Sequence, residues 1–126
     1  TKSGRATRTL HSFYQMEDGS SLAFFEAPDM PFTFKPQHDF DLHIALEVTK
    51  EDLQMMFAKG KSAGIETRGI SDHGFIDSIY FRDPNGYVIE LTAKREGHDE
   101  IVAAATETAR QKLDEWQRTK PPVVST

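Results

Sequence analysis

The turn Asp83-Pro84-Asn85-Gly86 lies between two strand-like runs and limits how that part of the chain can fold. Proline, asparagine and glycine in this order suit a three-residue turn that ends in a G1 bulge, because Gly86 can adopt the left-handed conformation that the bulge requires. This turn predicts an antiparallel hairpin over 78–92 in which Tyr80 pairs with Glu90. A two-residue turn would shift the pairing by one residue and mix polar with apolar side chains, so the hydrophobic pattern independently favours the bulged register.

The bulged register gives this hairpin two different faces. One is apolar or aromatic and predicts the core face of a sheet, under a helix at 51–63; it carries Ile79, Phe81, Tyr87, Ile89 and Leu91. The other face is mainly polar and carries Ser78, Tyr80, Arg82, Val88, Glu90 and Thr92. Such a face is ordinary for a sheet that has one side in solvent.

A second strand changes this interpretation. Residues 40–48 alternate between apolar and other side chains, and His43 falls on the side away from Leu42, Ile44 and Leu46. A lone histidine on a strand is more often a packed or surface residue than a ligand. If the sheet is curved, however, its non-core face becomes a concave interior that could gather His43, Tyr80 and Glu90. A histidine and a glutamate from two strands on one concave face are typical of a metal site.

The rest of the chain supplies a helix, a further strand and a tail. Thr49 suits a helix N-cap, and Gly60 and Gly64 predict the end of that helix. A strand at 65–70 and a loop at 71–74 lead into the hairpin. A second helix is expected over Asp99–Lys120, where Pro121 and Pro122 stop it. Its Trp116 is expected to pack on the chain's own sheet or on a second subunit.

An earlier hairpin is predicted at 8–26. Its strand-like runs, Thr9–Met16 and Leu22–Glu26, flank an Asp18-Gly19 turn signal and resemble the last two strands of the later unit. This similarity suggests a weak internal repeat whose first copy is cut short. If Asp18-Gly19 forms a two-residue turn, His11 faces Glu26 on the same side as Phe13 and Phe24.

Composition excludes several classes of protein. A length of 126 residues corresponds to one domain. The formal charge of −5, with no basic cluster, argues against nucleic acid or an anionic membrane as the main partner. No apolar run approaches the ~18–20 residues of a membrane-spanning helix. Because the chain has no cysteine, disulfides, thiolate catalysis and zinc–thiolate sites are excluded, which fits a cytoplasmic location.

The run from His73 to Glu90 resembles the signature of extradiol ring-cleavage dioxygenases: a histidine, a hydrophobic-tyrosine pair, an acidic-Pro-x-Gly turn and a glutamate shortly after it. Ser71 is the one departure, since that signature prefers Gly, Asn, Thr or an aliphatic residue there. Together with His43-Ile-Ala-Leu at the start of an earlier strand, the run is similar to the vicinal oxygen chelate superfamily. This superfamily includes glyoxalase I, the bleomycin- and fosfomycin-resistance proteins and the extradiol dioxygenases. The resemblance covers 8–93, and the C-terminal helix has no counterpart in it.

The resemblance implies an α+β fold in which paired βαβββ modules form a cupped, half-open barrel around one divalent metal. Residues 1–126 would then be a single domain with an incomplete first module. Its parts would be the end hairpin of the first module at 8–26, a second βαβββ module at 40–93, and a C-terminal helix at 99–120.

The resemblance also implies roles for four residues. His43 and Glu90 match metal ligands, and His73 and Tyr80 match the second-sphere residues that orient substrate and oxygen in ring-cleaving members. A further histidine ligand from the first strand of the preceding module has no counterpart here. Either an upstream segment carrying that histidine is missing, which we favour, or another chain completes the site, or the site is defunct.

The leading functional hypothesis is therefore an Fe(II)- or Mn(II)-dependent extradiol-type dioxygenase, acting on a catechol-like aromatic substrate with O₂ and forming a homo-oligomer. One alternative is a glyoxalase-like isomerase or lyase. Isomerase-type members take a further ligand from the first module, where alignment of Gly19 with Gly86 places Ala23, Phe24 or Phe25, with Glu26 a residue or two too late. A second alternative is a metal-free binding or resistance protein that sequesters a small molecule.

Overall fold

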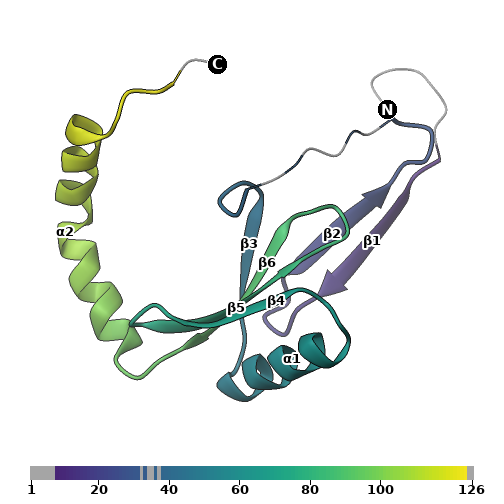
Figure 1. The fold of residues 1–126 in the computed structure, drawn as a ribbon, viewed down its shortest axis with the longest axis horizontal. Helices are drawn as coiled ribbons and strands as arrows, with labels where there is room; N and C mark the ends of the chain where they lie inside the picture. The colour runs from purple at the N-terminus through teal and green to yellow at the C-terminus, as the bar shows by residue number, and fades with distance from the viewer. Residues whose placement is uncertain (1–7, 32, 34–35, 37, 125–126) are drawn as a thin grey trace. The chain divides into compact units, whose positions relative to one another are not determined.

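The computed structural model describes residues 8–31, 33, 36 and 38–124. The chain divides into two compact units, Thr1–Lys35 and Pro36–Thr126. The α+β class predicted from the sequence is confirmed, since the described residues form two sheets and two helices (Figure 1). That residues 1–126 make one domain stays a prediction.

The first unit contains the predicted early hairpin. Strands β1 (Leu10–Gln15) and β2 (Ser21–Glu26) pair antiparallel. Their turn is longer than two residues: the Met16 amide donates to the Ser20 carbonyl at 2.8 Å, and Gly19 takes a φ of 84°. As a result His11 pairs with Phe25, and the predicted pairing of His11 with Glu26 is wrong.

The second unit contains a complete βαβββ module. Its strands are β3 (His43–Glu47), β4 (Thr67–Asp72), β5 (Ile76–Arg82) and β6 (Val88–Lys94), in the sheet order β3-β6-β5-β4. Helix α1 (Lys50–Ser62) follows β3 and lies against one face of this sheet (Figure 1). Strand β3 runs parallel to β6, and the other neighbours are antiparallel. The module predicted at 40–93 is therefore present.

The register of the last hairpin is the one that its turn predicted. Tyr80 pairs with Glu90, and the Asp83 amide donates to the Tyr87 carbonyl at 2.9 Å. Gly86 has a φ of 88°, close to the value at Gly19 in the earlier hairpin. The two hairpins thus share one turn geometry, which agrees with the weak internal repeat in the sequence.

The core of the module lies between α1 and the apolar face of the sheet. Its buried residues are Leu53, Ile79, Leu91 and Ala93, and Leu46, Val48, Met56, Phe57 and Phe81 pack around them. Thr49 caps α1 as predicted, because its Oγ1 accepts from the Asp52 amide at 3.1 Å. Burial of this apolar surface is the main term that stabilises the module.

Two local predictions are wrong at their boundaries. Gly60 does not end α1 but lies inside it, buried; a Cβ there would stand 2.6 Å from Phe81, so glycine permits the close approach of the helix to the sheet. Gly64, with a φ of 69°, follows the end of the helix as expected. Strand β4 extends over Ser71 and Asp72, which were predicted to be loop, because these residues pair with Ser78 and Asp77.

Helix α2 (His98–Thr119) confirms the predicted C-terminal helix, and none of its residues is buried. It ends with the Lys120 amide donating to the Trp116 carbonyl at 2.8 Å, just before Pro121. Among the described residues, neither helix has the length and apolar character needed to cross a membrane.

Candidate metal centre on the polar face of the sheet

His43 and Glu90 meet on the face of the sheet that does not contact α1. In the parallel β3–β6 pairing Ala45 lies beside Glu90, so His43, two residues earlier, is on the same face. His43 Nε2 is 2.7 Å from Glu90 Oε2, and 28% and 12% of the two side chains are exposed. The structure therefore brings together the two residues that were predicted to be ligands.

The other ring nitrogen of His43 is also engaged. Nδ1 lies 3.0 Å from the carbonyl oxygen of Asp39, in the segment before β3. With protons on both nitrogens, the imidazolium donates to this carbonyl and to Glu90. The Asp39 carbonyl, and next the Glu90 carboxylate, raise the pKa of His43. A histidine that donates from one nitrogen to a carbonyl presents the other toward a metal in many metalloproteins.

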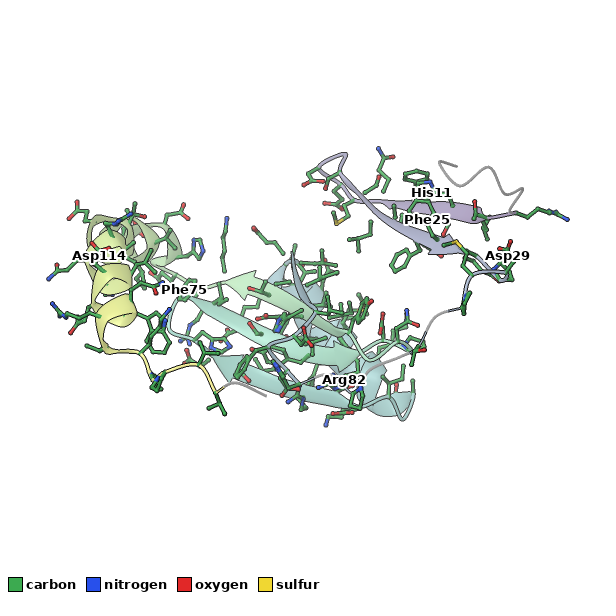
Figure 2. All side chains as sticks on the ribbon, turned by 90° about the horizontal axis from the view of Figure 1, so that it is seen from above. His11, Phe25, Asp29, Phe75, Arg82 and Asp114 are labelled. Carbon is green, nitrogen blue, oxygen red and sulfur yellow. The ribbon has the colours of Figure 1, made fainter. Side chains whose placement is uncertain are left out.

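Asp39 also connects three segments of the module. Its carboxylate pairs with Arg68 of β4 at 2.7 Å and with Arg82 of β5, and Arg82 donates to the Gly86 carbonyl at 2.7 Å. Arg82 is labelled in Figure 2 near the turn end of the hairpin. These cations, Arg68 first, hold the pKa of Asp39 below its usual value. The contacts fix the segment whose carbonyl orients His43.

Sequence reasoning did not assign a role to Asp39. It lies in a proline-containing connector without periodicity, and Arg68 and Arg82 are on two different strands. Only the pairing of β4 with β5 places the two guanidinium groups next to each other, since Arg68 pairs with Tyr80, two residues before Arg82.

Tyr80 and His73 form a second pair beside the first. His73 Nε2 is 2.7 Å from the Tyr80 hydroxyl, and the rings of Tyr80 and His43 are 6.1 Å apart, edge to face. Burial, followed by the charge of Glu90, raises the pKa of Tyr80. The guanidinium of Arg68 lies 5.7 Å from the Tyr80 ring centroid, a cation–π contact that holds the ring in place. All four predicted site residues are therefore contiguous.

The donors present suit a divalent metal but do not complete its site. An imidazole nitrogen and a carboxylate oxygen are ligands used by Mn, Fe and Zn. Their 2.7 Å separation is close to the ~3 Å expected of two ligands that share one metal with bonds of about 2.1 Å. In the described part of the chain, however, no three His, Cys, Asp or Glu residues are grouped so that they could hold a metal ion. The ligand roles of His43 and Glu90 stay a prediction.

The early hairpin does not offer an obvious carboxylate equivalent to Glu90. Because the two turns match at Gly19 and Gly86, the position of Glu90 corresponds to Ala23. Strand β2 pairs with β1 without a bulge, so Glu26 lies on the opposite face of the hairpin from Ala23. Glu26 therefore does not take the position that corresponds to Glu90.

No protein-family model matches the chain. Its sequence is similar to a metallothiol transferase, FosB, from Bacillus licheniformis, with 40% identity over 78 residues. That match covers 59% of this chain and 48% of the relative, so the chain spans about half the length of the curated relative that it matches.

Solved structures show the same fold. A glyoxalase/dioxygenase from Nostoc punctiforme is 22% identical with a TM-score of 0.57, over 68% of this chain and 61% of that one. A glyoxylase/bleomycin resistance protein/dioxygenase domain from Frankia is 23% identical with a TM-score of 0.58, over 75% and 72%. The fosfomycin resistance protein FosX of Listeria monocytogenes is 21% identical with a TM-score of 0.52, over 73% and 70%. The chain therefore has the fold of the vicinal oxygen chelate superfamily, as the motif in its last hairpin predicted.

Proposed function

We propose that this chain contributes to the divalent-metal centre of an enzyme, with His43 Nε2 and Glu90 as two of the metal's ligands. The observation that carries the proposal is the 2.7 Å contact between them, combined with the hydrogen bond from His43 Nδ1 to the Asp39 carbonyl. On metal binding, the ion would replace the proton on Nε2, and the Asp39 carbonyl would keep the ring oriented.

At least one more protein ligand is required, and we propose that it is a histidine supplied from elsewhere in the protein or from another chain. The bound metal would act as a Lewis acid that polarises a substrate oxygen. A FosX structure is described as a complex with Mn(II), which supports Mn(II) as a candidate for this site. Fe(II) is the metal that the dioxygenase hypothesis favours, and Mn(II) is compatible with it.

One candidate reaction is extradiol cleavage of a catechol-like aromatic by O₂. It is favoured by the pair formed by His73 and Tyr80, whose 2.7 Å contact lies beside Glu90. In this reaction the pair would accept a proton from the substrate hydroxyl and return one during ring opening. The high pKa of Tyr80 keeps its hydroxyl protonated at neutral pH, so that it can donate to a developing oxyanion.

The second candidate is transfer of a thiol to a small oxygen-bearing substrate. It is favoured by the 40% identity with a metallothiol transferase. Here the chain's own residues would bind and orient the substrate, with Tyr80 again placed to donate to an oxygen. The glyoxalase-like alternative loses its specific support, because Glu26 lies on the opposite face from Ala23.

Parallel assays distinguish these possibilities. The full chain is loaded anaerobically with Fe(II) or Mn(II) and tested for O₂ consumption with a panel of catechols, and for thiol adducts with fosfomycin. Oxygen uptake with ring-opened product supports the dioxygenase, and a thiol adduct supports the transferase. Tight binding of a small molecule by metal-free protein, with neither activity in any loaded form, would favour the binding-protein alternative and contradict the enzyme proposal.

A further inference from the structure

We propose that α2 is a dimerisation helix, and that it pairs in antiparallel orientation with α2 of a second copy of this chain. The proposal is independent of the metal centre. It starts from the observation that this 22-residue helix buries none of its residues. The family resemblance seen in the sequence ends before α2, so the helix needs an explanation of its own.

The helix carries an apolar stripe along one side. Ile101, Ala105, Ala109, Leu113 and Trp116 follow one another at intervals of three or four residues, which places them on one face. The larger members are substantially exposed: 44% for Ile101, 48% for Leu113 and 58% for Trp116. An exposed stripe of this kind on a regular helix is typical of a surface that packs against another helix.

The sizes of these side chains favour an antiparallel partner of identical sequence. Large residues stand at the two ends of the stripe, Ile101 at one and Trp116 at the other, with Ala105 and Ala109 between them. In an antiparallel pair, Ile101 of each copy meets Trp116 of the other. Ala105 of each copy then lies against Leu113 of the other, and Ala109 lies near the two-fold axis, where its small side chain allows the helices to approach closely. Such a contact is self-complementary, as a two-fold interface must be.

The charges along α2 favour the same orientation. Residues 98–109 contain three acidic residues, Asp99, Glu100 and Glu107, and no lysine or arginine. Residues 110–120 contain four basic and two acidic residues, so the charges of the two segments are −3 and +2. Antiparallel pairing brings the acidic half of each helix against the basic half of the other. Parallel pairing would place like charges together, and it would also align the helix dipoles unfavourably.

The first test is the oligomeric state of the full chain, with a matched pair of variants. Trp116 is the only tryptophan, so its fluorescence reports on this stripe directly. We expect wild-type protein to be a dimer by sedimentation, with Trp116 emission that moves to longer wavelength on dilution. Ala109→Glu puts two like charges near the two-fold axis and should weaken the dimer at least about 100-fold. Ala103→Glu makes the same change about 120° round the helix and should leave the dimer unchanged.

The second test is orientation, which the absence of cysteine makes simple. A single cysteine at Ala109, close to the two-fold axis, should form a disulfide-linked dimer on mild oxidation, whereas one at Val102 should not. Equal crosslinking at both positions would indicate parallel helices and refute the proposal. So would a dimer that Ala109→Glu leaves intact. A monomer whose Trp116 emission is blue-shifted and independent of concentration would show that α2 packs on its own chain instead.

Discussion

Replacing Glu90 by glutamine tests the metal centre most directly. The substitution keeps the size of the side chain but removes the charge from an oxygen that lies 2.7 Å from His43 Nε2. Loss of an outer-shell partner alone typically lowers metal affinity 10–100-fold, so loss of a charged ligand should lower it at least ~100-fold. Thermal unfolding with and without Mn(II) converts this change into a measurable shift.

The size of that shift follows from linkage. At a free Mn(II) concentration about 100 times the wild-type dissociation constant, binding stabilises the folded state by about 2.7 kcal/mol. The unit that holds the site spans Pro36–Thr126, and for a unit of roughly 90 residues this corresponds to a rise in Tm of about 10–20 °C. For Glu90→Gln at the same Mn(II) concentration the stabilisation falls to about 0.4 kcal/mol, or a rise of about 2–3 °C.

Glu47→Gln is the matched control. Glu47 lies on β3, pairs with Thr92 two residues after Glu90, and therefore projects from the same face of the sheet. This control should keep the full Mn(II)-dependent rise in Tm, and His43→Gln should lose it as Glu90→Gln does. A Glu90→Gln protein that is stabilised by Mn(II) as much as wild type would refute the ligand assignment. Lack of saturable Mn(II) binding by wild-type protein in which the further ligand is present would refute the proposed centre.

Three further predictions concern the surroundings of the site and the core. Tyr80→Phe should leave Mn(II) binding intact and lower turnover roughly 100- to 1000-fold in whichever assay shows activity; unchanged turnover would exclude a catalytic hydroxyl. The Arg95 guanidinium, and next the Gly74 amide, lower the pKa of Asp72 in the folded state. The Asp72 carboxylate therefore stabilises the folded protein above about pH 4, and this stabilisation is lost as the pH falls through the lowered pKa. The Tm difference between wild type and Asp72→Asn should therefore shrink as the solution is acidified, and a constant difference would contradict this. Gly60→Ala should lower the free energy of unfolding by about 1–2 kcal/mol in urea titrations, because the clash of the new Cβ with Phe81 outweighs the gain in helix propensity. A more stable variant would show that the close approach of α1 to the sheet does not require glycine.

Much of the module could be predicted because its information is local. The Asp83–Gly86 turn chooses one register, and that register separates an apolar from a polar face, so the pairing of Tyr80 with Glu90 follows from neighbouring residues alone. The same holds for the cap at Thr49 and for the alternation of β3. The motif that ends at Glu90 was enough to indicate the superfamily fold.

The early hairpin shows where local information was insufficient. Two turn lengths were compatible with Asp18-Gly19, and the longer one, with Gly19 in the left-handed region, moved the partner of His11 from Glu26 to Phe25. Unlike the later hairpin, this one has apolar side chains on both faces, so hydrophobicity could not choose the register. The resulting stack of His11 on Phe25, with ring centroids 3.8 Å apart, was not predicted (Figure 2).

The sequence by itself therefore determined the elements of the module, the register of its last hairpin and the residues that were candidates for a metal site. Only the tertiary structure decided that His43 contacts Glu90, because that contact depends on the parallel pairing of β3 with β6 across an intervening helix and two strands. It also decided that Asp39 orients His43 while its carboxylate joins Arg68 and Arg82, and that Gly60 lies in a helix–sheet contact. These are contacts between residues far apart in the chain, and a local pattern of turns, caps and periodicity carries no record of which distant strands will lie together.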